Sequence, residues 1–249
     1  MGLKEKRIIE LGSIDSTNSY ADRLLKEGKV QEGTIIWSTE QTAGKGQGRN
    51  KWLSEPGKNL MISIILCPHF LPAEDQFMLN KSVTLGALDF ANDLLPGRYC
   101  KIKWPNDIYC DSGKLGGILI SNTVSGSRLD TSVIGIGINI NQTRFDPAIP
   151  DPTSVKIVLA EETDLGYALE KLIDKLDQYY ALLKRGNMKE LDELYRSNLL
   201  GIDQPGKFRS GNEIFSGTIL DVNRFGSLII DTPGKGRLVF AHKEVEYVF

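Results

Sequence analysis

The first 200 residues of the chain combine short stretches with a strand-like period and longer stretches with a helical period. From 59 to 66 every second residue is apolar, which places Leu60, Ile62, Ile64 and Leu66 on one face of a predicted strand. The other predicted strands cover 34–39, 99–110, 114–122 and 132–141. Predicted helices cover 73–95, 165–185 and 189–199, and a shorter one follows Asp15-Ser16-Thr17-Asn18 and ends at Gly28. The proline-containing stretch 142–162 is predicted to be a loop.

The predicted strand over 132–141 has two very different faces. One face carries isoleucine at 134, 136, 138 and 140, and the other carries Gly135, Gly137 and Asn139. A strand face without side chains allows a ligand, another backbone or a helix to approach closely. The pattern does not distinguish a ligand from a helix that packs on this face.

After Gly201 the pattern changes to short apolar runs separated by Gly, Asn and Pro, which is typical of a small β-barrel-like module. About fifty residues form a small core at best, so we expect this module to pack on the main domain. We therefore predict two domains, 1–200 and 201–249. The fold class is α+β, with a mixed, mainly antiparallel sheet backed by helices.

Composition and charge exclude several classes of protein. The net charge of −2 gives no general attraction to nucleic acid or to an anionic membrane. Three scattered cysteines are typical of reduced thiols, and two histidines are too few for common metal or triad chemistry. We find no apolar run of membrane-spanning length and no signal-like apolar region, so we expect a cytoplasmic protein.

A glycine-rich loop, Gly44-Lys45-Gly46-Gln47-Gly48-Arg49, follows the strand predicted over 34–39. Glycines allow close backbone approach, and their N–H groups can point at an anion. The loop does not match a Walker loop or the dinucleotide fingerprint. On its own, this pattern is more typical of a flexible, solvated loop with ordinary lysines.

Lys103-Trp104-Pro105-Asn106-Asp107 lies in the strand predicted over 99–110, which places Lys103 and Asp107 on one face. A three-residue turn at 111–113 would place Cys110 near Lys114 and Asp107 across from Gly117. The bare position at Gly117 leaves room beside the carboxylate. A lysine at such a turn can neutralise a carboxylate or a phosphate, although most turn lysines are simply solvated.

Three blocks of the sequence together resemble the biotin–protein ligases. They are Gln41 to Gln47 with Trp52, Lys103 to Asp107 with Lys114-Leu115-Gly116-Gly117-Ile118, and Gly135-Ile136-Gly137-Ile138-Asn139, preceded by Asp15-Ser16-Thr17-Asn18. The resemblance implies a class II synthetase-like catalytic domain, as in biotin and lipoate ligases, and a C-terminal SH3-like β-barrel. The glycine loop departs from the family, because Lys45, Gln47 and Asn50 stand where arginines are usual and Arg49 where a glycine is usual.

The resemblance implies an ATP-dependent reaction in two steps that uses Mg²⁺. Biotin and ATP form biotinoyl-5′-AMP, and a lysine of a biotin carboxyl carrier domain then receives the biotin. It assigns catalysis to Lys114 and Asp107 with help from Lys45, and it names no residue as a metal ligand. Lys114 would contact the carboxylate and the phosphate, and Asp107 would orient or deprotonate the acceptor amine.

The same resemblance assigns the binding residues. For biotin they are Ser16, Thr17, Asn18, Gln41, Gly44, Lys45, Gly46, Gln47, Lys114, Gly117, Leu119 and Gly135. For the nucleotide they are Lys45, Gln47, Arg49, Trp52, Asn106, Lys114 and Asn139. Ser16 and Thr17 are also compatible with plain capping of the helix that follows.

Three other functions fit parts of the pattern. A lipoate ligase shares the fold and the adenylate chemistry, a biotin-responsive repressor adds a DNA-binding domain, and a sequestering protein would bind biotin without catalysis. About fifteen residues precede Ser16, too few for a helix-turn-helix domain, so we expect a ligase that binds neither DNA nor membranes. The pattern leaves open whether the protein is a monomer or a homodimer.

Overall fold

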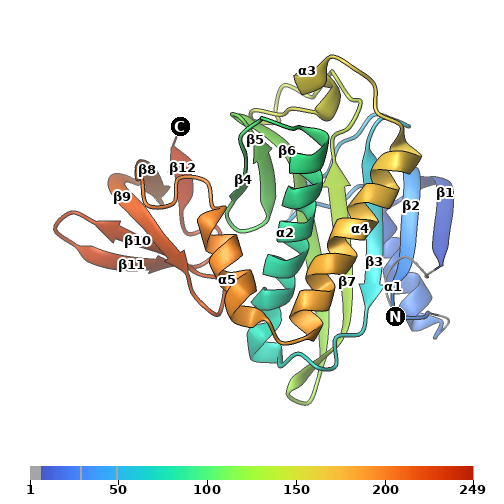
Figure 1. Cartoon of the computed structure of the whole chain (residues 1–249), viewed down its shortest axis with the longest axis horizontal. Helices are drawn as coiled ribbons and strands as arrows, with labels where there is room; N and C mark the ends of the chain where they lie inside the picture. The colour runs from blue at the N-terminus through green and yellow to red at the C-terminus, as the bar shows by residue number, and fades with distance from the viewer. Residues whose placement is uncertain (1–6, 29, 49, 249) are drawn as a thin grey trace.

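The computed structural model describes residues 7–28, 30–48 and 50–248. It contains one large sheet with helices and a second, smaller sheet formed by the C-terminal residues (Figure 1). The predicted α+β class, with a mixed and mainly antiparallel main sheet, is confirmed.

The main sheet has seven strands in the order β1-β2-β3-β7-β6-β5-β4. Only the β1–β2 pair is parallel. The strands are β1 (Ile8–Ile14), β2 (Thr34–Gln41), β3 (Leu60–Leu66), β4 (Cys100–Lys103), β5 (Asp107–Cys110), β6 (Gly113–Ser125) and β7 (Arg128–Ile138).

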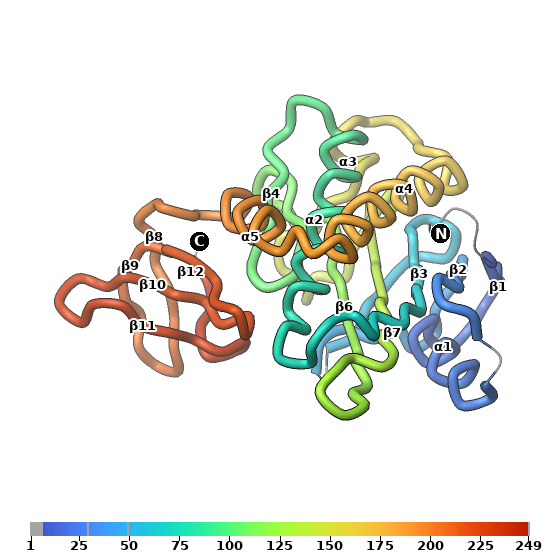
Figure 2. The backbone as a smooth tube through the Cα atoms, turned by 60° about the horizontal axis from the view of Figure 1, so that its bottom comes forward, coloured from blue at the N-terminus to red at the C-terminus, as the bar shows by residue number. Residues whose placement is uncertain are grey.

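Helices cover the two faces of this sheet unequally. Two long helices lie across one face (Figures 1 and 2), where the isoleucines of β7 are buried together with the apolar side chains of these helices. The short first helix lies on the opposite face, where its Ala21 is buried against Ile36, Ile65 and Val133. The helices are α1 (Thr17–Lys26), η2 (Ala73–Asp75), α2 (Gln76–Leu94), α3 (Val155–Leu159), α4 (Leu165–Lys184) and α5 (Met188–Ser197).

The prediction of a single strand over 99–110 is wrong, because the chain reverses direction between Lys103 and Asp107. Pro105 cannot donate to a strand ladder, and the Trp104–Pro105 peptide bond is cis. β4 and β5 form a tight antiparallel hairpin in which Lys103 pairs directly with Asp107. The two side chains share a face because they lie opposite each other, and not because they alternate along one strand.

The following turn is shorter than predicted. Cys110 pairs with Gly113 and Tyr109 with Lys114, and an irregularity between Ile108 and Tyr109 restores the predicted pairing of Asp107 with Gly117. Two elements are additional to the prediction: strand β1, and the short helix α3 within the segment expected to be a loop.

The C-terminal sheet is antiparallel, with the order β11-β10-β9-β8-β12. Its apolar residues belong to the same buried cluster as the core of the main sheet, as expected for a module that packs on the main domain. Its strands are β8 (Pro205–Ser210), β9 (Glu213–Val222), β10 (Leu228–Thr232), β11 (Gly236–Phe240) and β12 (Glu246–Val248).

Polar contacts reinforce this docking. The indole N–H of Trp104 donates to the carbonyl of Gly226 at 2.9 Å, and Arg224 forms a two-pronged ion pair with Asp75 at 2.5 and 2.9 Å. The buried Lys81 ammonium of α2 donates to the carbonyl of Val222 in β9 at 3.4 Å and also bonds the Asp192 carboxylate of α5. These contacts hold the two sheets in a defined relation.

Within the described residues, no helix is both long enough and apolar enough to cross a membrane.

Candidate functional site

A row of side-chain-free positions crosses the centre of the main sheet. Gly117 of β6 pairs with Gly137 of β7, and Gly137 pairs in turn with Met61 of β3. On the other side Gly117 pairs with Asp107. Directly paired residues point to the same face of a sheet. The register therefore creates a shallow bare strip that ends at a carboxylate.

Asp107 and Lys114 form an ion pair at the end of this strip. Lys114 Nζ lies 2.6 Å from Asp107 Oδ2, and each side chain is a little over a quarter exposed. A Cβ on Gly117 would lie 2.9 Å from Asp107 Oδ1 and 3.6 Å from Lys114 Nζ. The missing side chain at Gly117 thus leaves room for a pair that remains accessible to a ligand.

A second lysine stands beside this pair. Lys103 Nζ lies 3.2 Å from the Tyr109 hydroxyl and over the rings of Tyr109 and Tyr247, 4.8 and 5.5 Å from their centroids. Burial lowers the pKa of Lys103, against the opposing effect of Asp107. Burial, together with Asp107, raises the pKa of Tyr109 to about 12. This part of the site is therefore partly desolvated and strongly charged.

Polar side chains gather where α1 begins. Gln41 Oε1 accepts from the Thr17 N–H at 2.7 Å and from its hydroxyl at 3.1 Å. Ser63 Oγ lies 2.8 Å from Thr17 Oγ1 and 2.5 Å from Asn18 Oδ1. A Cβ on Gly135 would collide with the Asn18 amide, so the bare position on β7 admits this amide.

Ser16 is the N-cap residue of α1, but its side chain makes no capping hydrogen bond. It is also buried, with 2% of its surface exposed. Simple capping therefore does not account for this serine. The structure brings together five predicted site residues from separate parts of the sequence: Ser16, Thr17, Asn18, Gln41 and Gly135.

The glycine-rich loop closes on itself as a small hairpin. The Gly46 N–H donates to the Asn50 carbonyl at 2.9 Å, and the Trp52 N–H donates to the Gly44 carbonyl at 3.0 Å. Lys45 forms an isolated bridge with Lys51, and its side chain is exposed. Arg49, assigned above to the nucleotide, lies outside the described residues.

Trp52 lies over the bare strip. A Cβ on Gly137 would approach the Trp52 ring to between 2.5 and 3.0 Å. The indole Nε1 is buried and has no hydrogen-bond partner among the described residues. A buried donor without a partner is costly, and a bound ligand with an acceptor atom would satisfy it.

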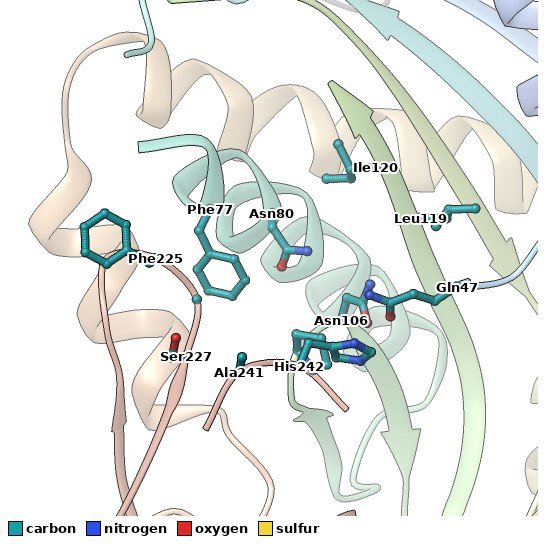
Figure 3. Close-up of a pocket in the computed structure, with 12 residues that line it drawn as sticks. Gln47, Phe77, Asn80, Asn106, Leu119, Ile120, Phe225, Ser227, Ala241 and His242 are labelled. Atoms are coloured by element: carbon teal, nitrogen blue, oxygen red, sulfur yellow. The ribbon is translucent and has the colours of Figure 1, made fainter. Parts of the chain in front are cut away.

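A pocket of about 250 Å³ lies where the main sheet meets the C-terminal sheet (Figure 3). Asn106 lines it and is tied to β6, because its amide donates to the Ile118 carbonyl at 2.6 Å. The Tyr195 hydroxyl donates to the Pro105 carbonyl at 2.7 Å and holds the same turn. The lining residues are Gln47, Phe77, Asn80, Pro105, Asn106, Leu119, Ile120, Phe225, Gly226, Ser227, Ala241 and His242.

Asn139 is bound within the fold. Its amide donates to the carbonyl of Thr153 at 3.0 Å, and its backbone N–H donates to Leu115. The bond to Thr153 joins the 142–154 segment to the main sheet. The structure therefore gives Asn139 a structural task in addition to the nucleotide contact that was predicted.

Four residues that lie around the site were not predicted as site residues from the sequence: Ser63, Lys103, His242 and Lys243. A signal existed for Ser63, because it is the polar residue in the otherwise apolar run of β3. No signal existed for His242, whose ring lies 5.7 Å from that of Trp104. The contact depends on how the C-terminal sheet docks.

The bare sheet strip, the glycine loop and the Lys114–Asp107 pair all lie within one matched region of the sequence. The model of the biotin/lipoate A/B protein ligase family matches residues 11–139, more than half of the chain. The chain therefore belongs to this family of enzymes, which confirms the resemblance seen in the sequence.

Individual relatives cover most of the chain. It is 26% identical to the biotin–[acetyl-CoA-carboxylase] ligase of Paracoccus denitrificans, over 94% of the chain and 98% of that protein. It is 29% identical to the bifunctional ligase/repressor BirA of Bacillus spizizenii, over 88% of the chain and 67% of that protein. Its structure superposes on that of the biotin protein ligase of Aquifex aeolicus in complex with biotin and ATP with a TM-score of 0.80. The two sequences are 26% identical, and the superposition covers 97% of this chain and 99% of the Aquifex chain.

Proposed function

We propose that this protein is an ATP-dependent biotin–protein ligase that forms biotinoyl-5′-AMP and transfers biotin to a lysine of a biotin carboxyl carrier domain. The observation that carries the proposal is the accessible Lys114–Asp107 ion pair at the end of a bare glycine strip. Family membership and the structural relative bound to biotin and ATP support it.

In the first step an oxygen of the biotin carboxylate attacks the α-phosphorus of ATP. The bond from that phosphorus to the bridging oxygen breaks, and pyrophosphate leaves with the electron pair. Because a carboxylate and a triphosphate repel each other, a cation must lie between them. Lys114 is the candidate, since its ammonium already faces the bare strip through its pair with Asp107. Lys45 and the loop amides would enclose the phosphates.

In the second step the acceptor lysine attacks the carbonyl carbon of biotinoyl-AMP, and AMP leaves with the bond electrons. A lysine amine has a pKa of about 10.4 and is mostly protonated at neutral pH. Asp107 would orient the ammonium and accept its proton. When substrate draws Lys114 away, the Asp107 carboxylate becomes available for this task.

The polar group at the start of α1 fits the ureido ring of biotin, which needs both donors and acceptors within an apolar slot. Ser16, Thr17, Asn18 and Gln41 would provide them, with Ser63 behind. The walls of the biotin slot would be formed by the loop backbone at Gly44 and Gly46, by the bare positions Gly117 and Gly135, and by Leu119. Gln47 would lie at the rim of the slot.

The nucleotide would lie beside Trp52, whose ring packs on Gly137 and whose buried indole N–H has no partner among the described residues. Asn106 and Asn139 are the candidates for the adenine edge. Mg²⁺ would accompany ATP and be held chiefly by its phosphates, as is usual for this ion. The described residues nowhere gather three or more His, Cys, Asp or Glu side chains in an arrangement suited to a metal.

Several expectations from the sequence remain predictions. The domain boundary near residue 200 is supported by the change from the main sheet to the second sheet after α5. The net charge of −2 supports a partner other than DNA, and we still expect a cytoplasmic location. The acceptor carboxylase and the choice between monomer and homodimer are matters for experiment.

The test is to incubate the protein with ATP, Mg²⁺, labelled biotin and a biotin carboxyl carrier domain. We expect the label on one lysine of the carrier and biotin-dependent release of pyrophosphate. Labelling by lipoate instead would make the protein a lipoate ligase, and biotin binding without pyrophosphate release would make it a sequestering protein.

A further inference from the structure

A buried tyrosine lies behind the turn of the β4–β5 hairpin. Tyr195 of α5 has no exposed surface, and its hydroxyl donates to the Pro105 carbonyl at 2.7 Å. Burial raises the pKa of Tyr195 well above its ordinary value, so the hydroxyl keeps its proton at neutral pH and remains a donor. This bond joins α5 to the turn between Lys103 and Asp107.

The ring of Tyr195 is held in place by its other neighbours. It meets the Phe77 ring edge-on, with 5.9 Å between the centroids and 85° between the planes. The Lys81 ammonium lies 5.3 Å from the centroid of the Tyr195 ring and bonds Asp192, which lies one turn earlier on α5. Because a ring enclosed in a packed interior has little freedom to move, the position of its hydroxyl is well defined.

The chain that follows α5 bonds the outer edge of the same hairpin. The Ile102 N–H donates to the Asn198 carbonyl at 2.9 Å, and the Leu200 N–H donates to the Ile102 carbonyl at 2.8 Å. β4 is the last strand of the main sheet, so these bonds occupy backbone groups that would otherwise be unpaired. The end of α5 and the residues after it therefore hold both the edge and the turn of the hairpin.

The turn carries Asn106, for which the sequence predicted a nucleotide contact. Asn106 and Phe77 both line the pocket (Figure 3). The Asn106 side-chain amide donates to the Ile118 carbonyl at 2.6 Å, and the Ile118 N–H donates to the Asn106 carbonyl at 3.2 Å. Among the described residues no donor bonds Asn106 Oδ1, so this oxygen can accept a hydrogen bond from a ligand.

Asn106 is therefore held from two sides. Ile118 holds its side chain and its carbonyl from β6. Tyr195 holds the peptide group in front of it, because the Pro105 carbonyl and the Asn106 nitrogen belong to one planar unit. Adenine offers an exocyclic amino group as a donor, which suits the free Oδ1 of Asn106.

We propose that Tyr195 is a positioning residue that orients Asn106 toward the amino group of the adenine of ATP. The inference rests on the proposed function and deepens it. It assigns part of the affinity for ATP to α5, through a side chain that lies behind the wall of the pocket and contacts Phe77 and Pro105 of its lining.

Tyr195→Phe removes the hydroxyl and keeps the ring, and Tyr180→Phe is the matched control. Tyr180 of α4 is also buried and donates one hydrogen bond, to Glu32 at 3.0 Å. Glu32 lies just before β2, which is separated from β5 by three strands. Each variant should lower the Tm by at least about 2 °C, the effect of one lost buried hydrogen bond in a chain of this size.

Only Tyr195→Phe should change the use of ATP. Its KM for ATP in pyrophosphate release should rise by about fivefold, the scale of one neutral hydrogen bond. Its kcat, and the biotin Kd without ATP, should stay within about twofold of the parent, a margin below the loss of one such bond. Tyr180→Phe should keep the KM of the parent although its Tm falls.

A double-mutant cycle separates the orientation of Asn106 from a general loosening of the fold. Once Asn106 is replaced by alanine, Tyr195→Phe should have no further effect on the KM for ATP, because its influence passes through that side chain. A rise in KM of the same size in both backgrounds would overturn the proposal, as would an unchanged KM in Tyr195→Phe alone. A parent protein that releases no pyrophosphate with biotin would instead refute the proposed function itself.

Discussion

At the residue scale the ion pair between Lys114 and Asp107 is the centre of the site. One group is the candidate for the adenylation step and the other for the transfer step, and in the structure each is the partner of the other. The sequence predicted both residues, and the register placed Asp107 opposite Gly117 as expected. The ion pair between them was not predicted, because the distance between two side chains depends on their rotamers and on the turn.

Replacement of Lys114 by alanine tests the first step. The variant should lose at least about 100-fold in biotin-dependent pyrophosphate release, which is the scale of the loss of one key electrostatic group. The measurement is the initial rate of pyrophosphate release. Lys26→Ala, at the exposed end of α1, should behave like the parent. A near-normal rate in the Lys114 variant would contradict the assignment.

Replacement of Asp107 by asparagine tests the second step and keeps the size of the side chain. Transfer from preformed biotinoyl-AMP to the carrier should slow by about 100-fold or more, the usual contribution of a positioned general base. The biotin Kd, measured by calorimetry, should hardly change. Equal single-turnover transfer rates in variant and parent would show that Asp107 has no such task.

At the element scale the bare strip is made by two strands acting together. β7 provides Gly135 and Gly137, β6 provides Gly117, and the antiparallel register places Gly117 opposite Gly137 and Leu119 opposite Gly135. The alternation of isoleucine and glycine predicted a bare face on β7 from the sequence. It could not predict which groups lie on that face, and the structure places the Asn18 amide and the Trp52 ring there.

Replacement of Gly137 by alanine tests the strip. The new methyl group would meet the Trp52 ring and displace it. The Kd for ATP should then rise at least about fivefold, because stacking of a base on an aromatic ring contributes about 1–3 kcal/mol. The measurement is calorimetry with a non-hydrolysable ATP analogue.

Gly12→Ala on β1 is the matched control, because a Cβ there meets no atom within 4 Å. It should bind nucleotide like the parent. Equal affinities in both glycine variants would show that Trp52 does not depend on the bare strip for its position.

Pro105 shows where interpretation at this scale failed. The turn signal at 111–113 predicted one strand over 99–110 on its N-terminal side. The hairpin around the cis Trp104–Pro105 bond was not predicted, because the pattern of residue types does not fix where the chain reverses. The strand β1 was missed because it lies at the edge of the sheet, where all its residues are exposed or only half-buried.

At the scale of the whole molecule, the C-terminal sheet is joined to the main sheet by a shared core and by ion pairs. Arg224 bonds Asp75 and Glu74. The Arg224 guanidinium holds the pKa of Asp75 below its ordinary value of 3.8. A carboxyl group with a lowered pKa stabilises the fold above its ordinary pKa, and this stabilisation is lost as the pH falls through the lowered pKa.

Replacement of Asp75 by asparagine should therefore lower the Tm at neutral pH. The difference in Tm from the parent should be constant above about pH 5 and should shrink as the pH falls below about 4, where the parent carboxyl begins to protonate. Thermal unfolding measured across this range provides the check. Glu213→Gln, which breaks an exposed distal pair, should have little effect. A Tm difference independent of pH would contradict the assignment.

The sequence by itself determined the periodic features of this protein: the α+β class, the long helices, the glycine loop, the bare face of β7 and the Lys114 and Asp107 positions. Each of these features depends on residues that are close in the chain, because hydrophobic periodicity and turn-forming residues determine local structure directly. Only the tertiary structure decided which distant groups meet, such as Thr17 with Gln41 and Ser63, and Lys243 with Gly48. These contacts follow from strand register and from the docking of the second sheet, which arise from the packing of the whole core rather than from any local pattern.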